Sequence, residues 1–389
     1  MARLTIFFLA ALSILGGIHF YLWARLVRDT QVPPPLRVWL TAALLALALS
    51  LPATMLVMRQ LPPAWARLVA WPAFVWMGLM FLSFVLLLTG DLVRALIAIG
   101  VRVQSGAGLD PGRRLLLARV LGGGAGAAAG VLGAVAVQQA LGKLVVKQVR
   151  VALPRLPAAH EGTTIVQLTD LHVGPTIGRA FVEHIVRETN ALQPDIVAIT
   201  GDLVDGSVAR LRHAVEPLRE LRARHGVFFV TGNHEYFSGA GAWVAELGRL
   251  GIRVLRNERV SVGDGPDAFD LAGVDDYSAA RFDDGHRPDV ARALAGRDRS
   301  RALVLLAHQP RVVREAAEHG VDLQLSGHTH GGQLWPFSYF VKLQQPYVSG
   351  LHRHGDTIIY VSPGTGYWGP PMRLGTHAEI TRITLTRAG

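Results

Sequence analysis

Four long apolar segments constrain this chain more than any other feature of its sequence. They cover about residues 4–23, 38–58, 68–90 and 120–141, and short links that carry arginine separate them. A helix needs about 20 predominantly apolar residues to cross the hydrocarbon core of a bilayer, and each segment has that length. One long buried helix can occur in a soluble domain, but four such segments in series point to a membrane. We therefore predict a bundle of four transmembrane helices within residues 1–150.

Two of the apolar segments carry further information. The first differs from a signal peptide, because its apolar run is long, no cleavage site of small residues follows it, and more spans come after it. The fourth is rich in glycine and alanine, which suits close contact between helices in lipid. We find in these spans no group of acidic or basic residues that would mark a translocation path, and we expect Asp91 near a helix end.

An even number of spans places the N-terminus and the C-terminal half on the same side of the membrane. Basic residues are enriched in cytoplasmic links. One set of links holds eight of them, namely Arg25, Arg28, Arg37, Arg94, Arg102, Arg113, Arg114 and Arg119. The opposite set holds seven, namely Arg3, Arg59, Arg67, Lys143, Lys147, Arg150 and Arg155. The difference of one predicts an integral protein of the cell (inner or plasma) membrane whose C-terminal domain faces outward.

Charge and cysteine content exclude several classes of function. The formal net charge is +10, but no basic cluster with interleaved aromatic residues is present, so we expect no nucleic-acid partner. Arginines that flank the membrane spans account for much of the charge. The chain has no cysteine, which excludes disulfides, thiolate catalysis and cysteine-based zinc sites.

After about residue 151 the sequence changes to short β-branched runs separated by helix-like stretches, which predicts an α/β domain over residues 151–389. Five of these runs end in residue types that bind metals, and such side chains meet at the carboxyl ends of parallel strands. The candidate ligands are Asp170, His172, Asp202, Asn233, His308, His328 and His330. Mixed nitrogen and oxygen ligands predict a metal site that suits Mn, Fe or Zn.

The order of these motifs, DxH, GDxxDG, GNHE, an isolated histidine and GHTHGGQ, resembles the calcineurin-like metallophosphoesterases over about residues 163–385. The later text YVSPGTGYWGPPMRLG resembles a membrane-associated subgroup that includes the YkuE-like and YaeI-like bacterial phosphodiesterases and the transmembrane metallophosphoesterases. The resemblance implies a four-layer α-β-β-α sandwich with two divalent metal ions. It assigns Asp170, His172 and His330 to the first ion, Asn233, His308 and His328 to the second, and Asp202 to both as a bridge.

The resemblance also assigns roles to residues that bind no metal. It makes His234 the group that stabilises the transition state or protonates the leaving oxygen, as an imidazole that titrates near neutrality can do. Asp205 and Glu235 either orient a ligand histidine or brace a loop. Arg373, in the closing segment, is expected to bind a substrate phosphate. Histidines outside the motifs, such as His160, are expected at the surface.

Together these features predict a membrane-anchored phosphoesterase with two metal ions that hydrolyses phosphodiester, phosphomonoester or pyrophosphate bonds. The resemblance and the anchor suggest a lipid-linked substrate of the UDP-diacylglucosamine type, and hence a role in lipid metabolism. The alternative is a non-catalytic membrane scaffold or transporter with a metal-binding globular domain, which the complete ligand set disfavours. The ligands alone would also permit metal-dependent amide hydrolysis, which the order of the motifs disfavours.

Aromatic residues crowd the segment directly after the histidine pair, residues 334–352, which reads LWPFSYFVKLQQPYVSGLH. Aromatic rings with a polar edge favour a membrane interface. Two interpretations follow. Either these rings pack over the sheet as part of the core, or the segment reaches the headgroup region of a bilayer.

Overall fold

The computed structural model describes residues 2–58, 60–105, 110–282 and 286–388. Arg59, one of the basic residues counted above, lies outside the described residues. The chain divides into two compact units. One unit contains Met1–Gln138 with Gly369–Met372, and the other contains Gln139–Trp368 with Arg373–Gly389.

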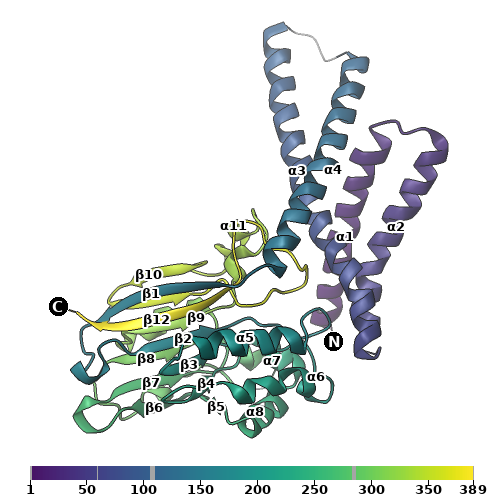
Figure 1. Ribbon diagram of the computed structural model, residues 1–389. Coiled ribbons are helices and arrows are strands. Elements are labelled where there is room, and N and C mark those ends of the chain that lie inside the picture. Colours follow the sequence, from purple (N-terminus) through teal and green to yellow (C-terminus); the bar gives the residue numbers. More distant parts are fainter. Residues whose placement is uncertain (1, 59, 106–109, 283–285, 389) are drawn as a thin grey trace. The chain divides into compact units, whose positions relative to one another are not determined.

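The first unit is built from long helices (Figure 1). They are α1 (Ala2–Trp23), which continues into the π-helical turn η1 (Ala24–Arg28), α2 (Pro34–Val57), α3 (Pro63–Ser105) and α4 (Pro111–Leu141). Four stretches are long and apolar enough to cross a membrane: Phe8–Arg28, Pro34–Val57, Pro63–Gly100 and Pro111–Leu141. The four predicted spans are therefore confirmed. The third and fourth helices begin earlier than expected, each at a proline, because the fixed φ of proline suits the first helical turn.

The charged residues of this unit contradict one expectation. Asp91 lies within the third span, where its carboxylate accepts a hydrogen bond from the Tyr21 hydroxyl at 2.7 Å. It also pairs with Arg25 at 2.6 Å and with Arg94 at 3.0 Å, and Arg25 pairs with Asp29 at 2.5 Å. The spans thus do contain a charged cluster. We missed it because its members come from different helices and meet only in the folded unit.

Two six-stranded sheets form the second unit. The first has the order β1 (Val145–Leu153), β12 (Glu379–Arg387), β2 (Thr164–Leu168), β3 (Ile196–Ile199), β4 (Val227–Phe229) and β5 (Arg253–Val254). The second has the order β10 (Gly350–His354), β11 (Thr357–Val361), β9 (Leu323–Ser326), β8 (Leu303–Leu306), β7 (Phe269–Gly273) and β6 (Glu258–Val262). Strands β2 to β5 are parallel to one another, as are β7, β8, β9 and β11. Strand β1 starts at Val145, before the expected boundary at residue 151.

Helices cover the outer faces of both sheets. They are α5 (Arg179–Ala191), α6 (Val208–Val215), α8 (Ala240–Arg249), α9 (Val290–Ala293) and α10 (Val313–Glu318). Two further short helices, α7 (Asn233–Ser238) and α11 (Ser338–Val341), lie in the connections after β4 and β9. Short 3₁₀ helices lie in other connections: η2 (Ala158–His160), η3 (Glu216–Glu220), η4 (Gly265–Asp267), η5 (Ala279–Arg281), η6 (Pro310–Val312) and η7 (His330–Gly332). One apolar core joins the two sheets, a second joins the first sheet to α5, α6 and α8, and a third joins the second sheet to α9 and α10. This arrangement confirms the four-layer α-β-β-α sandwich.

The sequence pattern explains these layers. Every residue of β2, β3, β8 and β9 is buried, as expected for strands covered on both faces, and β3 (IVAI) and β8 (LVLL) therefore read as continuous apolar runs. Helix α5 instead buries one stripe, in which Val182, Ile185, Val186 and Thr189 recur at intervals of three, one and three residues. That spacing turns one face of the helix toward the sheet.

His160 is not at the surface, contrary to expectation. Its side chain is buried, and its ring meets the Phe269 ring edge to face at a centroid distance of 4.8 Å. Burial, reinforced by the nearby His225, lowers the pKa of His160. His160, which lies outside the motifs, is therefore a residue of the core.

Candidate metal centre

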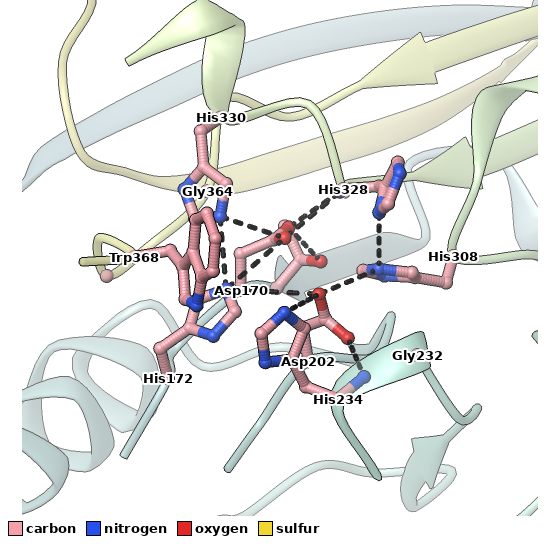
Figure 2. Close-up of polar contacts among 12 residues, drawn as sticks. Asp170, His172, Asp202, Gly232, His234, His308, His328, His330, Gly364 and Trp368 are labelled. Carbon is pink, nitrogen blue, oxygen red and sulfur yellow. Dashed lines mark hydrogen bonds and ion pairs between the residues drawn. The ribbon is translucent and has the colours of Figure 1, made fainter. Parts of the chain in front are cut away.

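The carboxyl ends of the strands bring the predicted ligands together. Asp170 and His172 follow β2, Asp202 follows β3, Asn233 follows β4, His308 follows β8, and His328 and His330 follow β9. Figure 2 shows the aspartate and histidine side chains of this set pointing toward one another from opposite sheets. The parallel direction of the strands within each sheet places these loops at one edge, where ligands collect in α/β folds.

The loops that carry the ligands have an uncommon backbone conformation. Five of the seven ligands have a positive φ, with values of 53° for Asp170, 50° for His172, 51° for Asp202, 72° for His328 and 51° for His330. Residues other than glycine rarely adopt this region, and strain of this kind persists mainly at functional sites. The backbones also approach closely, because a Cβ on Gly232 would lie 2.5 Å from the backbone nitrogen of Asp202.

The first group of ligand atoms comes from Asp170, His172 and His330. The Nε2 atoms of His172 and His330 are 3.0 Å apart, and Asp170 Oδ1 lies 3.4 Å from His330 Nε2. All three side chains are buried. Their atoms lie within 4.8 Å of one another, which is the spacing of ligands around one ion.

The second group comes from Asp202, His308 and His328. Asn233, the remaining predicted ligand, follows β4 in the chain. His308 Nε2 lies 3.1 Å from Asp202 Oδ2 and 3.2 Å from His328 Nδ1. Asp202 also approaches the first group, since its Oδ2 is 3.9 Å from His172 Nε2. One carboxylate oxygen is therefore near ligands of both groups.

These residues fit divalent metal ions. Two buried polar atoms of the set, Asn233 Oδ1 and His330 Nδ1, have no hydrogen-bond partner among the described residues. Buried polar atoms are normally paired, so an unpaired amide oxygen in a cluster of imidazoles and carboxylates is suited to a cation. Imidazole nitrogens and carboxylate oxygens are ligands that Mn, Fe and Zn accept.

The protonation of the histidines is consistent with this use. Burial, together with repulsion from the neighbouring His308, lowers the pKa of His328 to about 3, and burial beside His172 lowers the pKa of His330 well below its usual value. Both imidazoles are thus neutral, as a metal ligand must be. Burial alone would lower the pKa of His308, but the charge of Asp202 outweighs burial and raises it. A cation bound there would displace that proton.

Asp205 orients two imidazoles rather than one. Its Oδ1 lies 3.1 Å from Nδ1 of His172 and 2.6 Å from Nδ1 of His234. In each case an Nδ1–H donates to the carboxylate, which turns Nε2 toward the centre. Burial opposes the negative charge of Asp205, but His172 and His234 outweigh it and lower its pKa. Of the two roles that the sequence left open for Asp205, the structure supports that of a carboxylate that orients histidines.

Glu235 braces the backbone of the site. Its carboxylate accepts hydrogen bonds from the backbone N–H groups of Asp202 at 3.0 Å, Leu203 at 2.8 Å and Gly232 at 2.6 Å. The bond to Gly232 satisfies the N-cap N–H group of α7, the helix that Asn233 begins, as the N3 carboxylate of a capping box does. Glu235 thus links the loops after β3 and β4. Of the two roles that the sequence left open for Glu235, the structure supports the bracing of a loop.

The structure places Arg373 in the interior. The side chain is fully buried, and its guanidinium donates to the carbonyl oxygens of His330 at 3.3 Å, Pro363 at 2.8 Å, Gly364 at 3.3 Å and Gly366 at 2.5 Å. Burial lowers its pKa to about 10 despite the nearby charge of Asp170. Arg373 therefore supports the loop that carries His330, a use that the sequence did not indicate.

Two aromatic rings flank His234. Phe237 and Trp368 each meet the imidazole edge to face, at centroid distances of 5.2 Å and 5.6 Å, and both remain about half exposed. Gln333 fixes Trp368 through a pair of hydrogen bonds between its amide and the Trp368 backbone, at 2.9 Å and 3.0 Å. Sequence reasoning missed Phe237, although it lies three residues after His234 on the same short helix.

Comparison with known proteins agrees with this geometry. The family described as calcineurin-like phosphoesterase matches residues 163–332. A transmembrane protein with metallophosphoesterase domain from Bos taurus is 38% identical, over 98% of this chain and 88% of its own length. A metallophosphoesterase from Helicobacter pylori is 45% identical over 57% of this chain and 59% of its own, and the metallophosphoesterase YkuE from Bacillus subtilis is 31% identical over 59% and 81%.

The class of protein is therefore defined: it is a metal-dependent phosphoric ester hydrolase. The chain belongs to the metallophosphoesterase family, and its likeness to the transmembrane members extends through the apolar helices as well as the α/β unit. It is a membrane protein that acts on phosphoesters with divalent metal ions.

Proposed function

We propose that the α/β unit binds two divalent metal ions and uses them to hydrolyse phosphomonoester, phosphodiester or pyrophosphate bonds. The position of Asp202 carries this proposal. Its Oδ2 lies 3.1 Å from His308 Nε2 and 3.9 Å from His172 Nε2, between the two groups of ligands. A carboxylate shared by two ligand sets is the arrangement that a two-metal hydrolase requires.

The assignment of ligands follows the two groups. Asp170, His172 and His330 would hold one ion, with Asp202 shared. The second ion would be held by Asn233, His308 and His328. The unpaired Asn233 Oδ1 supports the place of the amide in this set. The identity of the ions stays open among Mn, Fe and Zn, all of which accept these ligands.

Two bound dications would lower the pKa of water to near neutrality and neutralise the phosphoryl oxygens. The residues of the chain supply the remaining parts. The water oxygen forms the new bond to phosphorus, the bond from phosphorus to the leaving oxygen breaks, and His234 Nε2 gives its proton to that oxygen. Burial would lower the pKa of His234, but the charge of Asp202 and the hydrogen bond to Asp205 raise it to about 9. The bond to Asp205, which lies outside the ligand set, would keep the proton of this imidazole available for the step when the ions compensate Asp202.

The proposed substrate is a lipid-linked phosphoester, for example a pyrophosphate of the UDP-diacylglucosamine type. Two observations support it: the membrane spans keep the chain at a bilayer, and the apolar rings of Phe237 and Trp368 flank the catalytic imidazole. Purified full-length protein with added Mn should be assayed on phosphomonoester, soluble phosphodiester and lipid-pyrophosphate substrates. We expect the highest kcat/KM on the lipid-linked substrate. Equal or higher values on small soluble esters would contradict the substrate proposal and leave the two-metal proposal intact.

A substrate contact for Arg373 stays a prediction, since it requires the guanidinium to exchange carbonyl partners for phosphate oxygens. Replacement by lysine keeps the charge and removes the planar fork. If Arg373 binds substrate, R373K should raise KM with little change in thermal stability. A lower thermal midpoint with unchanged KM would assign the side chain to loop support alone.

We propose further that the α/β unit faces outward from the cell membrane. The count of basic residues in the links supports this orientation by one residue. A reporter enzyme that is active only outside the cytoplasm, fused after Gly389, should be active. Activity of a reporter that works only in the cytoplasm would reverse the assignment.

A further inference from the structure

The segment directly after the histidine pair exposes an unusual amount of apolar surface. We call residues 335–343 the aromatic loop; it includes the short helix α11 (Figure 1). Its exposed side chains are Trp335 at 56%, Phe337 at 47%, Tyr339 at 60%, Phe340 at 57% and Leu343 at 83%. These rings are therefore not part of the core. Tyr347, farther along the same segment, instead packs against the buried Val313, Ile359 and Val361, so each of the two interpretations holds for one part of the segment.

The exposure is concentrated in this loop. The described residues of the α/β unit include 12 exposed large apolar side chains, and five of them lie within these nine residues. Scattered apolar side chains are ordinary on a protein surface, whereas a contiguous group marks an interaction site. The aromatic loop thus calls for a partner with apolar character.

The loop is held in place at both ends. At its start, Leu334 is buried and pairs with Leu374 in an isolated β-bridge, and the Trp335 backbone N–H donates to the Leu374 carbonyl at 2.9 Å. After its end, the buried Gln345 side chain accepts from the Arg311 backbone at 3.2 Å and donates to Gln309 at 3.2 Å. The rings are therefore presented on a fixed scaffold.

The charge around the loop favours an anionic partner. The sequence contains no acidic residue between Asp322 and Asp356, a stretch that includes the whole loop. Lys342 lies inside it, with its ammonium 5.5 Å from the centre of the Tyr339 ring. Tryptophan, tyrosine and lysine side chains combine an apolar body with a polar end, which suits the boundary between headgroups and acyl chains.

The chain itself keeps a bilayer within reach. Helix α4, a membrane span, ends at Leu141, and β1 of the α/β unit begins at Val145. Three residues can extend over about 10 Å at most. A bilayer surface is thus always near the α/β unit, whereas a second copy of the chain or a separate protein would have to be recruited.

We infer that the aromatic loop, residues 335–343, is a membrane-docking surface that inserts its exposed rings among the headgroups of the bilayer that holds the helices of the same chain. The inference does not depend on which phosphoester bond the site hydrolyses. It accounts for the exposed rings, the absence of acidic residues and the fixed ends of the loop together. Because the loop begins two residues after Gln333, which holds Trp368 beside His234, docking would also bring the catalytic imidazole near the bilayer surface.

The absence of cysteine makes a direct test possible. A single cysteine in place of Leu343, the most exposed side chain of the loop, can carry an environment-sensitive fluorophore, and a cysteine in place of the exposed Ala295 serves as the matched control. Both full-length variants are reconstituted into bilayers of phosphatidylcholine and phosphatidylglycerol, with and without bromine on the acyl chains. We expect brominated lipid to quench the label at position 343 and to leave the label at position 295 unchanged.

A second variant keeps the test decisive if the first does not fold. Y339C places the label on α11, at another exposed position, and an unchanged thermal midpoint shows that either variant is intact. The inference would be overturned if brominated lipid quenched the loop label no more than it quenched the control label. Excimer formation by a pyrene label at position 343 would also overturn it, because the loop would then join two copies of the chain.

Discussion

Two clusters of charged and polar side chains lie in apolar surroundings, one in each unit, and they are built on opposite principles. In the helical unit, Asp91 meets Arg25 and Arg94, so each charge has an opposite partner. In the α/β unit, like groups meet instead. The imidazole nitrogens of His172 and His330 are 3.0 Å apart. Burial, together with the like charge of the neighbouring Asp202, raises the pKa of Asp170.

The difference shows which cluster needs something from outside the chain. Breaking a buried pair is costly because the remaining charge is left alone, so a self-compensating cluster holds helices together. Imidazole nitrogens and carboxylate oxygens whose lone pairs face one another are stabilised when cations bind between them. We therefore assign the first cluster to the stability of the helical unit and the second to metal binding and catalysis. The presence of charges in the spans does not by itself favour a transporter.

The largest effect is expected for Asp202, which both metal positions share. D202N should lower turnover by several orders of magnitude with the fold intact, because an amide cannot compensate two dications. Steady-state kinetics and thermal unfolding measure the two parts of this expectation. D275N is the matched control, since Asp275 is also buried but pairs with Arg256 at 2.8 Å outside the site. Near-normal activity of D202N with both ions bound would exclude the bridging role.

His234 should matter for rate but not for metal content. H234A should lose about 10²- to 10⁴-fold in kcat, as general acid–base groups typically contribute, and should retain both ions. The control is H184A, which removes an imidazole from the surface of α5. Loss of an ion in H234A, measured by elemental analysis, would move His234 into the ligand set.

Asp91 should show the reverse pattern. D91N leaves Arg25 and Arg94 without their shared partner, so the thermal midpoint of the full-length protein in a bilayer should fall. Its kcat on a small soluble phosphoester should change far less than in H234A, because the substitution leaves all the ligands in place. A loss of rate comparable to that of D202N would show that the helical cluster takes part in the reaction.

The smallest effect concerns pH and a histidine outside both clusters. Burial lowers the pKa of His160 in the folded protein, so the unfolded chain binds the proton first as the pH falls. The stabilisation from neutral His160 is therefore present above about pH 6.5 and is lost as the pH falls through the lower folded value. H160F keeps a buried ring that cannot titrate. Below about pH 6.5 its free energy of unfolding should fall less steeply than that of the wild type, with metal ions in excess.

A parallel fall in both proteins would assign that pH dependence to other groups. The comparison is best made on the slope of unfolding free energy against pH, since the aromatic replacement also changes packing against Phe269.

Much of the site could be predicted because its ligands stand at strand ends in an unbroken order of motifs. The ligands from Asp170 to His330 needed only residue types and the direction of parallel strands. The helical spans were found for a similar reason, since length and apolarity are local properties.

Residues whose roles depend on contacts far along the chain could not be predicted. Arg373 binds carbonyl groups, which leave no mark in the sequence, and the partners of Asp91 lie on other helices. The positive φ of His172 and His330 is likewise imposed by the loops around them. The aromatic loop was visible as a composition, but only the exposed fractions of its rings separated a surface from a core.

The central claim is that the facing ligand groups are completed by two divalent ions. Elemental analysis of the purified full-length protein, after equilibration with Mn and removal of free ion, tests it most directly. We predict two equivalents per chain in the wild type and in H234A, and fewer in variants of His330 or His308, one from each ligand group. One equivalent or none in the wild type, or two in both ligand variants, would contradict the account.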